Sequence, residues 1–159
     1  NLSGITMILA GLGVAFTGVN AMVPGLILPA ALTISVGVLM VVCGVFRMLG
    51  KNPTVWPDLL IGVFYAWWLM NSYSGWNANP HVQRYAFQLL AAAAMLFTLH
   101  RARLAGGYME RKRLVFFGFA GMFLSLAAIP GARDPLFFVA SGLWCAGGMP
   151  DLKKLKTEN

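Results

Sequence analysis

Charged residues are scarce in this sequence, and acidic ones most of all. Only 11% of the 159 residues are Asp, Glu, Lys or Arg, and only five residues are acidic. Soluble domains of this length carry about a quarter of their residues as charged side chains. Here 58% of the residues are hydrophobic and the mean hydropathy is +0.71, so a folded form in water would expose enough apolar surface to aggregate. The composition therefore predicts a protein that is surrounded by lipid.

The sequence also contains few residues of the kinds that form disulfides, metal sites and catalytic sites. The two cysteines, Cys43 and Cys145, are too few for a disulfide framework or a metal cluster, and we expect free thiols. We find no paired intramembrane acids, no histidine pair at metal-ligand spacing and no glycine-rich nucleotide loop. Two Ser-Gly pairs, at Ser74 and Ser141, lack a histidine placed to activate the hydroxyl. We expect no catalytic residues, no metal and no cofactor, and keep an enzyme that acts on lipid as a third hypothesis.

Long stretches without charge run through the chain. Residues 1–46 contain none, which is enough to cross a bilayer twice, since one transmembrane helix needs roughly 20 apolar residues. The sequence predicts an all-α, polytopic membrane protein whose single transmembrane domain covers residues 1–159 and forms three outward-pointing helical hairpins. The expected spans are residues 2–19, 28–49, 55–71, 82–104, 114–129 and 135–149. Five spans with one re-entrant segment are the alternative.

The distribution of basic residues predicts the orientation. With a cytoplasmic N-terminus, ten of the twelve Lys and Arg residues fall in inner connections and the C-terminal tail, and only Arg84 and Arg133 fall outside. Positive residues are retained on the cytoplasmic side during insertion, so we expect a multi-pass cell-membrane protein with both termini in the cytoplasm. The formal charge of +7 is then a topological signal. A nucleic-acid partner is not expected, because there is no basic soluble domain to bind one.

The first expected helix is rich in small residues that allow another helix to approach closely. Gly11 and Ala15 lie about one turn apart on it. Lipid supplies no hydrophobic drive between helices, so small residues indicate tight packing surfaces. We favour packing within the chain and keep docking of a partner membrane subunit on Gly11 and Ala15 as the alternative.

One outer surface combines aromatic, amide and basic side chains. The third expected helix ends in aromatic residues, an uncharged loop with amides follows, and His81, Arg84 and Gln88 share one face of the next helix. These groups could form an outward-opening pocket in which Arg84 binds a carboxylate or phosphate. The candidate ligand-binding residues are Trp67, Trp68, Asn71, Tyr73, Trp76, His81, Arg84 and Gln88. The alternative, which we favour, is an interfacial belt, since Trp and Tyr concentrate at membrane interfaces regardless of function.

Two titratable residues on the inner side have simpler interpretations. Asp58 follows Pro57 at the start of the third expected helix, where a proline and an acid are ordinary stabilising choices. A proton-carrying role for Asp58 is the less favoured alternative. His100 lies beside Arg101 at the inner end of the fourth helix, and we expect an interfacial side chain rather than a ligand.

Part of the chain resembles small multi-span proteins of unassigned function from Gram-positive bacteria. The resemblance runs from Trp56 to the end and is carried by the sequence Asn-Pro-His-Val-Gln-Arg-Tyr-Ala-Phe-Gln-Leu-Leu-Ala at residues 79–91, the basic loop and Phe-Phe-Gly at 116–118. It is a loose pattern and implies no activity.

The architecture is similar to that of the substrate-binding components of energy-coupling-factor vitamin transporters. The shared features are six helices, inner termini, a first helix of small residues and an aromatic outer loop. That resemblance implies capture of a small molecule from outside and docking on a shared membrane subunit through Gly11 and Ala15. The connection between the first two helices is shorter than in that family, and no vitamin-specific motif is present, so the likeness concerns fold alone.

Two functions follow as hypotheses. The first is a membrane component that binds or helps to move a small-molecule ligand at the outer surface. The second is a non-catalytic accessory subunit or assembly factor of a larger membrane complex, with a partner membrane subunit. Membrane lipid is an expected partner in both.

Overall fold

We describe a computed structural model of the chain, over residues 2–22, 27–51, 54–74, 82–108, 111–131 and 134–149, without the side chains of residues 72–74, 82–84 and 131. Six α-helices and one 3-10 turn make up these residues, which contain no β-strand. The helices are α1 (Leu2–Asn20), α2 (Ile27–Met48), α3 (Val55–Ser74), α4 (Val82–Ala105), α5 (Arg111–Ala128) and α6 (Pro135–Gly148), with the turn η1 (Ile129–Gly131) before α6. The all-α prediction is confirmed, and each expected segment has a helix whose bounds lie within three residues of it.

Two of the described helices, α1 and α2, are long and apolar enough to cross a membrane, and α6 is a shorter apolar helix. No charged residue occurs in α1, and α2 carries only Arg47 in its last turn. Helices α3, α4 and α5 carry charge near their ends, as where α5 begins with three basic residues, and α6 carries none. Length and composition thus support membrane insertion of the N-terminal hairpin.

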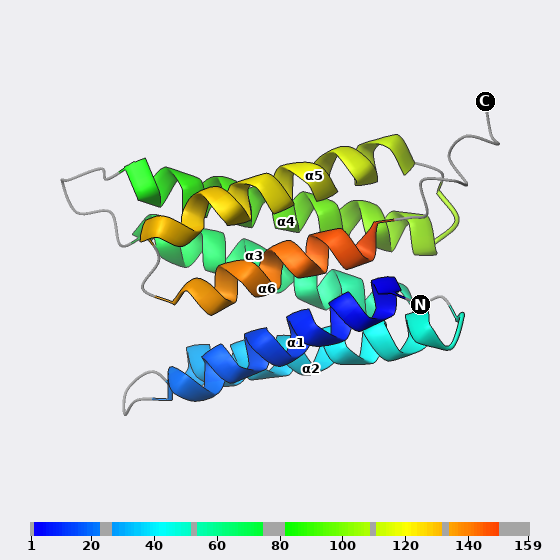
Figure 1. Ribbon diagram of the computed structural model, residues 1–159, viewed down its shortest axis with the longest axis horizontal. Coiled ribbons are helices and arrows are strands. Elements are labelled where there is room, and N and C mark those ends of the chain that lie inside the picture. Colours follow the sequence, from blue (N-terminus) through cyan, green and yellow to red (C-terminus); the bar gives the residue numbers. More distant parts are fainter. Residues whose placement is uncertain are drawn as a thin grey trace.

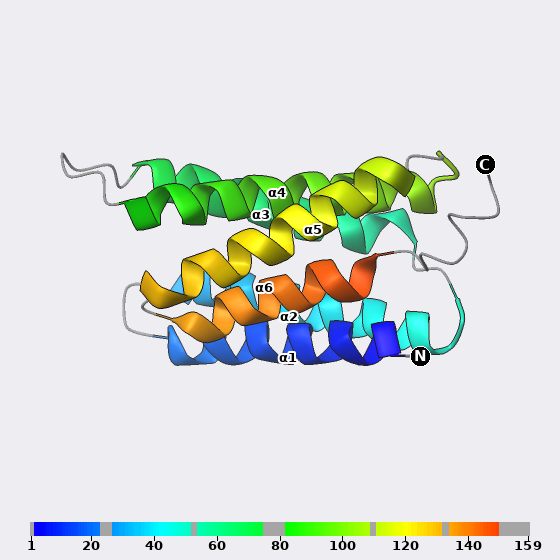
Figure 2. The ribbon, with the colours of Figure 1, turned by 45° about the horizontal axis from the view of Figure 1, so that its top comes forward.

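The helices form three antiparallel hairpins, α1–α2, α3–α4 and α5–α6 (Figure 1). The last residues of α1, α3 and α5 and the first residues of α2, α4 and α6 lie at one end of the bundle, and the first residues of α1 lie at the other (Figures 1 and 2). We call these the tip end and the terminal end. Helix α6 packs on α1 and α5, and α4 packs on α3 and α5, whereas α2 and α3 touch only sparsely. Consequently α6 joins the first hairpin to the rest.

Helices α1 and α2 are held together by a seam of glycines. A side chain on Gly11 would lie 2.5 Å from the Gly37 carbonyl oxygen, and one on Gly37 would lie 2.5 Å from the backbone nitrogen of Ala15. Gly4 and Gly44 meet in the same way seven residues away. Gly11 is buried against α2, so its surface is used for packing within the chain. Docking of a partner subunit on Gly11 and Ala15 stays a prediction.

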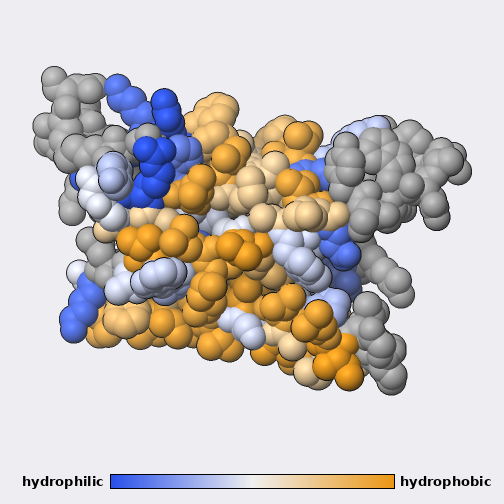
Figure 3. Space-filling view, turned by 180° about the vertical axis from the view of Figure 1, so that it is seen from behind, coloured by the Kyte–Doolittle hydropathy of each residue, from blue (hydrophilic) through white to orange (hydrophobic). Residues whose placement is uncertain are grey.

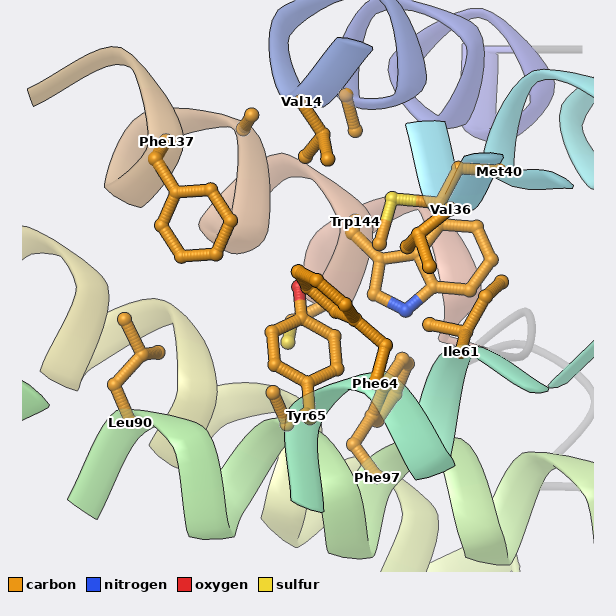
Figure 4. Packing of buried hydrophobic residues seen from close by; sticks show 14 of the residues in the cluster. Val14, Val36, Met40, Ile61, Phe64, Tyr65, Leu90, Phe97, Phe137 and Trp144 are labelled. Atoms are coloured by element: carbon orange, nitrogen blue, oxygen red, sulfur yellow. The ribbon is translucent and has the colours of Figure 1, made fainter. Parts of the chain in front are cut away.

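Large aromatic side chains fill the centre of the bundle. Trp144, Tyr65 and Phe97 are fully buried. The Trp144 indole extends from α6 into the space between Met40 on α2 and Ile61 on α3, with its ring nitrogen on the side that faces α3 (Figure 4). Trp144 thus fills the region where α2 and α3 make little direct contact.

Candidate functional site

Two tryptophans of the predicted outer site, Trp67 and Trp68, pack against the aromatic core. Trp68 is half-buried, and its ring centroid lies 4.9 Å from that of Phe137 and 6.0 Å from that of Phe138, both on α6. Trp67 packs against Phe64 of its own helix at 6.0 Å. These rings therefore contribute to helix packing between α3 and α6.

Only two of the remaining candidates of that site, Asn71 and Gln88, have described side chains. Asn71 is exposed near the end of α3, and Gln88 is half-buried in the second turn of α4. The side chains of Tyr73 and Arg84, and Trp76 and His81 altogether, lie outside the described residues. The predicted outer pocket stays a prediction.

A buried charged group lies at the opposite, terminal end. Asp58 stands in the first turn of α3, after Pro57, and its side chain is 0% exposed. An acid near a helix N-terminus is stabilised by the helix dipole, but at the surface it would remain hydrated. Asp58 is buried and has lost its hydration, which is costly for a charged group. Stabilisation by the helix dipole, the usual reason for an acid at the start of a surface helix, therefore does not by itself explain this residue.

Arg101 of α4 is the counter-ion of Asp58. Its Nε atom lies 3.2 Å from Asp58 Oδ2, and its side chain is only 5% exposed. Asp58 precedes and Arg101 follows the α3–α4 connection by similar lengths of chain, so the antiparallel hairpin places them side by side. Removing one member of such a pair costs about 3–5 kcal/mol, because the other charge remains buried and unpaired.

The Arg101 guanidinium is enclosed by residues of two further helices. Its central carbon lies 4.6 Å from the ring centroid of Trp144, in cation–π contact, and Nη1 is 3.5 Å from the sulfur of Met7 on α1. A Cβ atom on Gly148 would lie 2.9 Å from Nη1. Glycine at this position therefore lets α6 approach the cation.

Arg47 of α2 brings a second cation to this group. It donates from Nη2 to the Met149 carbonyl oxygen at 2.9 Å and from Nε to Ser3 Oγ at 3.2 Å. It is also close enough to Asp58 to interact electrostatically. A cation at the C-terminal end of α6 is favoured by the helix dipole. We call Asp58, Arg101, Arg47 and Trp144 the buried charged centre.

Several polar atoms of the buried charged centre lack hydrogen-bond partners among the residues that the structure describes. They are both carboxylate oxygens of Asp58, Nη2 of Arg101 and Nε1 of Trp144. The Asp58–Arg101 contact is thus an ion pair by distance, without the alignment of a hydrogen bond. Each unsatisfied buried polar atom costs about 1–3 kcal/mol, so the buried charged centre is the candidate functional site among the described residues.

A second polar group lies closer to the middle of the bundle. The Tyr65 hydroxyl donates to Ser141 Oγ at 3.1 Å, and Ser125 Oγ donates to the carbonyl oxygen of Phe138. These contacts are satisfied and join α3, α5 and α6. They stabilise the bundle.

His100 differs from its predicted environment. It is buried, and its ring stacks on Phe117 of α5 with centroids 5.3 Å apart and planes 10° apart. Its side chain therefore packs between α4 and α5 rather than at an exposed interface. The described residues contain no cluster of three or more His, Cys, Asp or Glu that could hold a metal ion.

A comparison with known protein families, curated proteins and solved structures finds no match for the chain. The resemblances noted from the sequence therefore stay predictions. The buried charged centre was missed because Arg101 counts as one of many inner basic residues in the sequence. The sequence feature that could have indicated this centre is Asp58, which is the only acidic residue within the six helices.

Proposed function

We propose that the chain is a six-span protein of the cell membrane, with both termini in the cytoplasm, that binds or helps to move a small solute. The membrane part rests on the exterior. Phe116 and Phe123 on α5 are 67% and 71% exposed, and α1 presents Leu9, Leu12 and Phe16 outward. Hydrophobic side chains cover the middle of one face, and hydrophilic ones gather toward its two ends (Figure 3). Such an apolar surface is suited to contact with lipid and would cause aggregation in water.

The orientation has a direct test. Reporter domains fused to the C-terminus and inserted at the connection of residues 75–81 should report opposite sides of the membrane, with the C-terminus cytoplasmic. Reporters on the same side would contradict the six-span topology, and a C-terminus outside would reverse the orientation.

The solute-binding part rests on the buried charged centre. Ionisable residues inside a membrane-embedded bundle are costly, and they commonly mark substrate and ion pathways. A purely structural ion pair would satisfy its donors and acceptors, whereas Asp58, Arg101 and Trp144 each have an atom without a hydrogen-bond partner among the described residues. A solute with polar groups would supply the missing partners. This centre replaces the aromatic outer loop as the site that we propose for the solute.

The test is mass spectrometry of the protein purified gently from its native membrane. The wild-type protein should retain a small molecule. The double variant Asp58→Leu/Arg101→Leu should lose it, because both charges are removed without leaving one unpaired. The matched control is Arg103→Gln, which alters an exposed arginine of the same helix whose guanidinium contacts Tyr108 at 5.8 Å. Equal retention by the double variant would exclude the buried charged centre as the site.

A second function is supported by α5, which presents Phe116, Phe119 and Phe123 as one exposed aromatic stripe. A stripe of large rings on one helix also suits the face of a partner membrane subunit, as expected for an accessory subunit or assembly factor. In the same experiment this function predicts a stoichiometric protein partner and no retained small molecule. Replacement of Phe119 by Ala should then release that partner.

A further inference from the structure

The buried charged centre contains more hydrogen-bond donors than acceptors. Two guanidinium groups, those of Arg101 and Arg47, lie near a single carboxylate. The described atoms of the centre without hydrogen-bond partners are the two Asp58 oxygens and two donors, Arg101 Nη2 and Trp144 Nε1, and these donors belong to groups in direct contact. Donors arranged around a cation in a buried site suit a carboxylate or phosphate oxygen, since hydrogen bonds that involve charged groups are the strongest. A cationic solute would meet two like charges here.

The carboxylate of Asp58 already occupies the position of an anion. An incoming anion that pairs with Arg101 would leave Asp58 as a second buried negative charge, which costs several kcal/mol in a low-dielectric interior. A proton taken from the cytoplasmic water onto Asp58 removes that cost. The carboxyl group then becomes neutral, the anion pairs with Arg101, and the net charge of the centre is the same before and after binding.

From this charge balance we infer that the buried charged centre takes a small monovalent anion together with one proton, with Asp58 as the proton acceptor. This inference rests on the proposed solute-binding function. It adds the class of the solute, a small anion, and the coupling of its binding to the uptake of one proton. Arg101 and Trp144 Nε1 bind the anion. Arg47 holds the end of α6, through the Met149 carbonyl oxygen, next to them.

The titratable groups around Asp58 allow this assignment. The described neighbours with an electrostatic interaction are Arg101 on α4 and Arg47 and Cys43 on α2. Helices α1 and α6 contribute Met7 and Trp144 to the centre, and neither side chain titrates near neutral pH. His100 stacks on Phe117 and faces α5. An arginine remains protonated at all relevant pH values, so Asp58 is the group that can accept the proton.

The test is calorimetric titration of the full chain in detergent, with acetate, benzoate and dihydrogen phosphate as probes, in two buffers that differ in ionisation enthalpy. The wild-type protein should take up about one proton for each anion bound. Its affinity should therefore fall about tenfold for each unit of pH rise. Binding without proton uptake by the wild-type protein would overturn the inference, and this readout needs no variant.

Three variants sharpen the result. Asp58→Asn should bind the probe more tightly, without proton uptake and without the tenfold change per pH unit, and its thermal stability should rise on adding the anion. Arg101→Gln should lose binding, and Arg103→Gln should behave as the wild type. Loss of binding in a folded Asp58→Asn would contradict the role of Asp58 as proton acceptor.

The outcomes separate this inference from the proposed function. Binding of neutral or cationic solutes that is lost in Asp58→Leu/Arg101→Leu would preserve solute binding and refute the anion. A wild-type protein that binds none of these solutes would refute both. Repeating the titration in zwitterionic and anionic lipid nanodiscs distinguishes a soluble anion from a lipid headgroup, because a headgroup ligand would displace the probe only in anionic lipid.

Discussion

The first two hairpins have the same antiparallel topology but are held together by different interactions. In α1–α2, glycines at the contact bring the two backbones together, as at Gly11 and Gly37. In α3–α4, the contact includes charge and hydroxyl groups, with the Asp58–Arg101 ion pair and Gly62 against Thr98. Close backbone packing stabilises the first hairpin along most of its length, and its one charged residue, Arg47, lies in the last turn of α2. The second hairpin instead buries a charge pair between its two helices, at a cost in desolvation.

The largest effect should come from separating the charges of the second hairpin. Asp58→Leu leaves Arg101 buried without its counter-ion, so we expect a loss of about 3–5 kcal/mol in the free energy of unfolding. The double variant Asp58→Leu/Arg101→Leu should recover most of it. The measurement is denaturant-induced unfolding in detergent micelles. A loss equal to that of the exposed-site control Asn71→Ala would show that the ion pair contributes nothing to stability.

A smaller effect is expected from the first hairpin. In Gly37→Ala, the new methyl group would lie 2.5 Å from the Ala15 nitrogen, so α1 and α2 must separate. We expect a loss of about 1–3 kcal/mol in the free energy of unfolding. The control is Gly106→Ala, where the nearest atom to the new methyl group is 3.4 Å away. Equal stability of the two variants would mean that the glycine seam is not needed for packing.

The smallest effect should come from the satisfied polar contact of α3. Tyr65→Phe removes the hydroxyl that donates to Ser141, and it should cost about 1 kcal/mol in thermal unfolding experiments. It should leave solute retention unchanged, because the contact lies outside the buried charged centre. Tyr85→Phe, at an exposed tyrosine of α4, is the matched control and should be neutral. Loss of solute in Tyr65→Phe would extend the site toward the middle of the bundle.

The helices were predictable from the sequence because long apolar runs, separated by charges and by Pro and Gly, mark where helices form and end. The bounds of the six helices follow from that pattern. The partner of each side chain does not follow, since helix rotation depends on packing. Trp67 and Trp68 were candidates for a pocket or for an interfacial belt, and their rings pack on Phe64 and Phe137. Rotation also decides whether Asp58 faces water or Arg101.

The pairing of Asp58 with Arg101 in the α3–α4 hairpin could have been predicted from the sequence. Asp58 lies about 20 residues before the middle of the connection at residues 75–81, and Arg101 lies about 23 residues after it, so an antiparallel pair brings them to one level. The position of Trp144 could not be predicted in this way, because α6 reaches the buried charged centre through long-range packing on α1 and α5. Local pairing within a hairpin is thus predictable, whereas the position of a third helix is not.

The location of Asp58 and Arg101 within one hairpin has a consequence for biosynthesis. The ribosome makes Asp58 about 40 residues before Arg101, so α3 lacks this counter-ion until α4 has been translated. Helices α1 and α2 contain no acidic residue. In the proposed six-span topology, α1 and α2 can leave the translocation channel before α3 is made, whereas α3 and α4 should partition into lipid together, once the Asp58–Arg101 ion pair has formed.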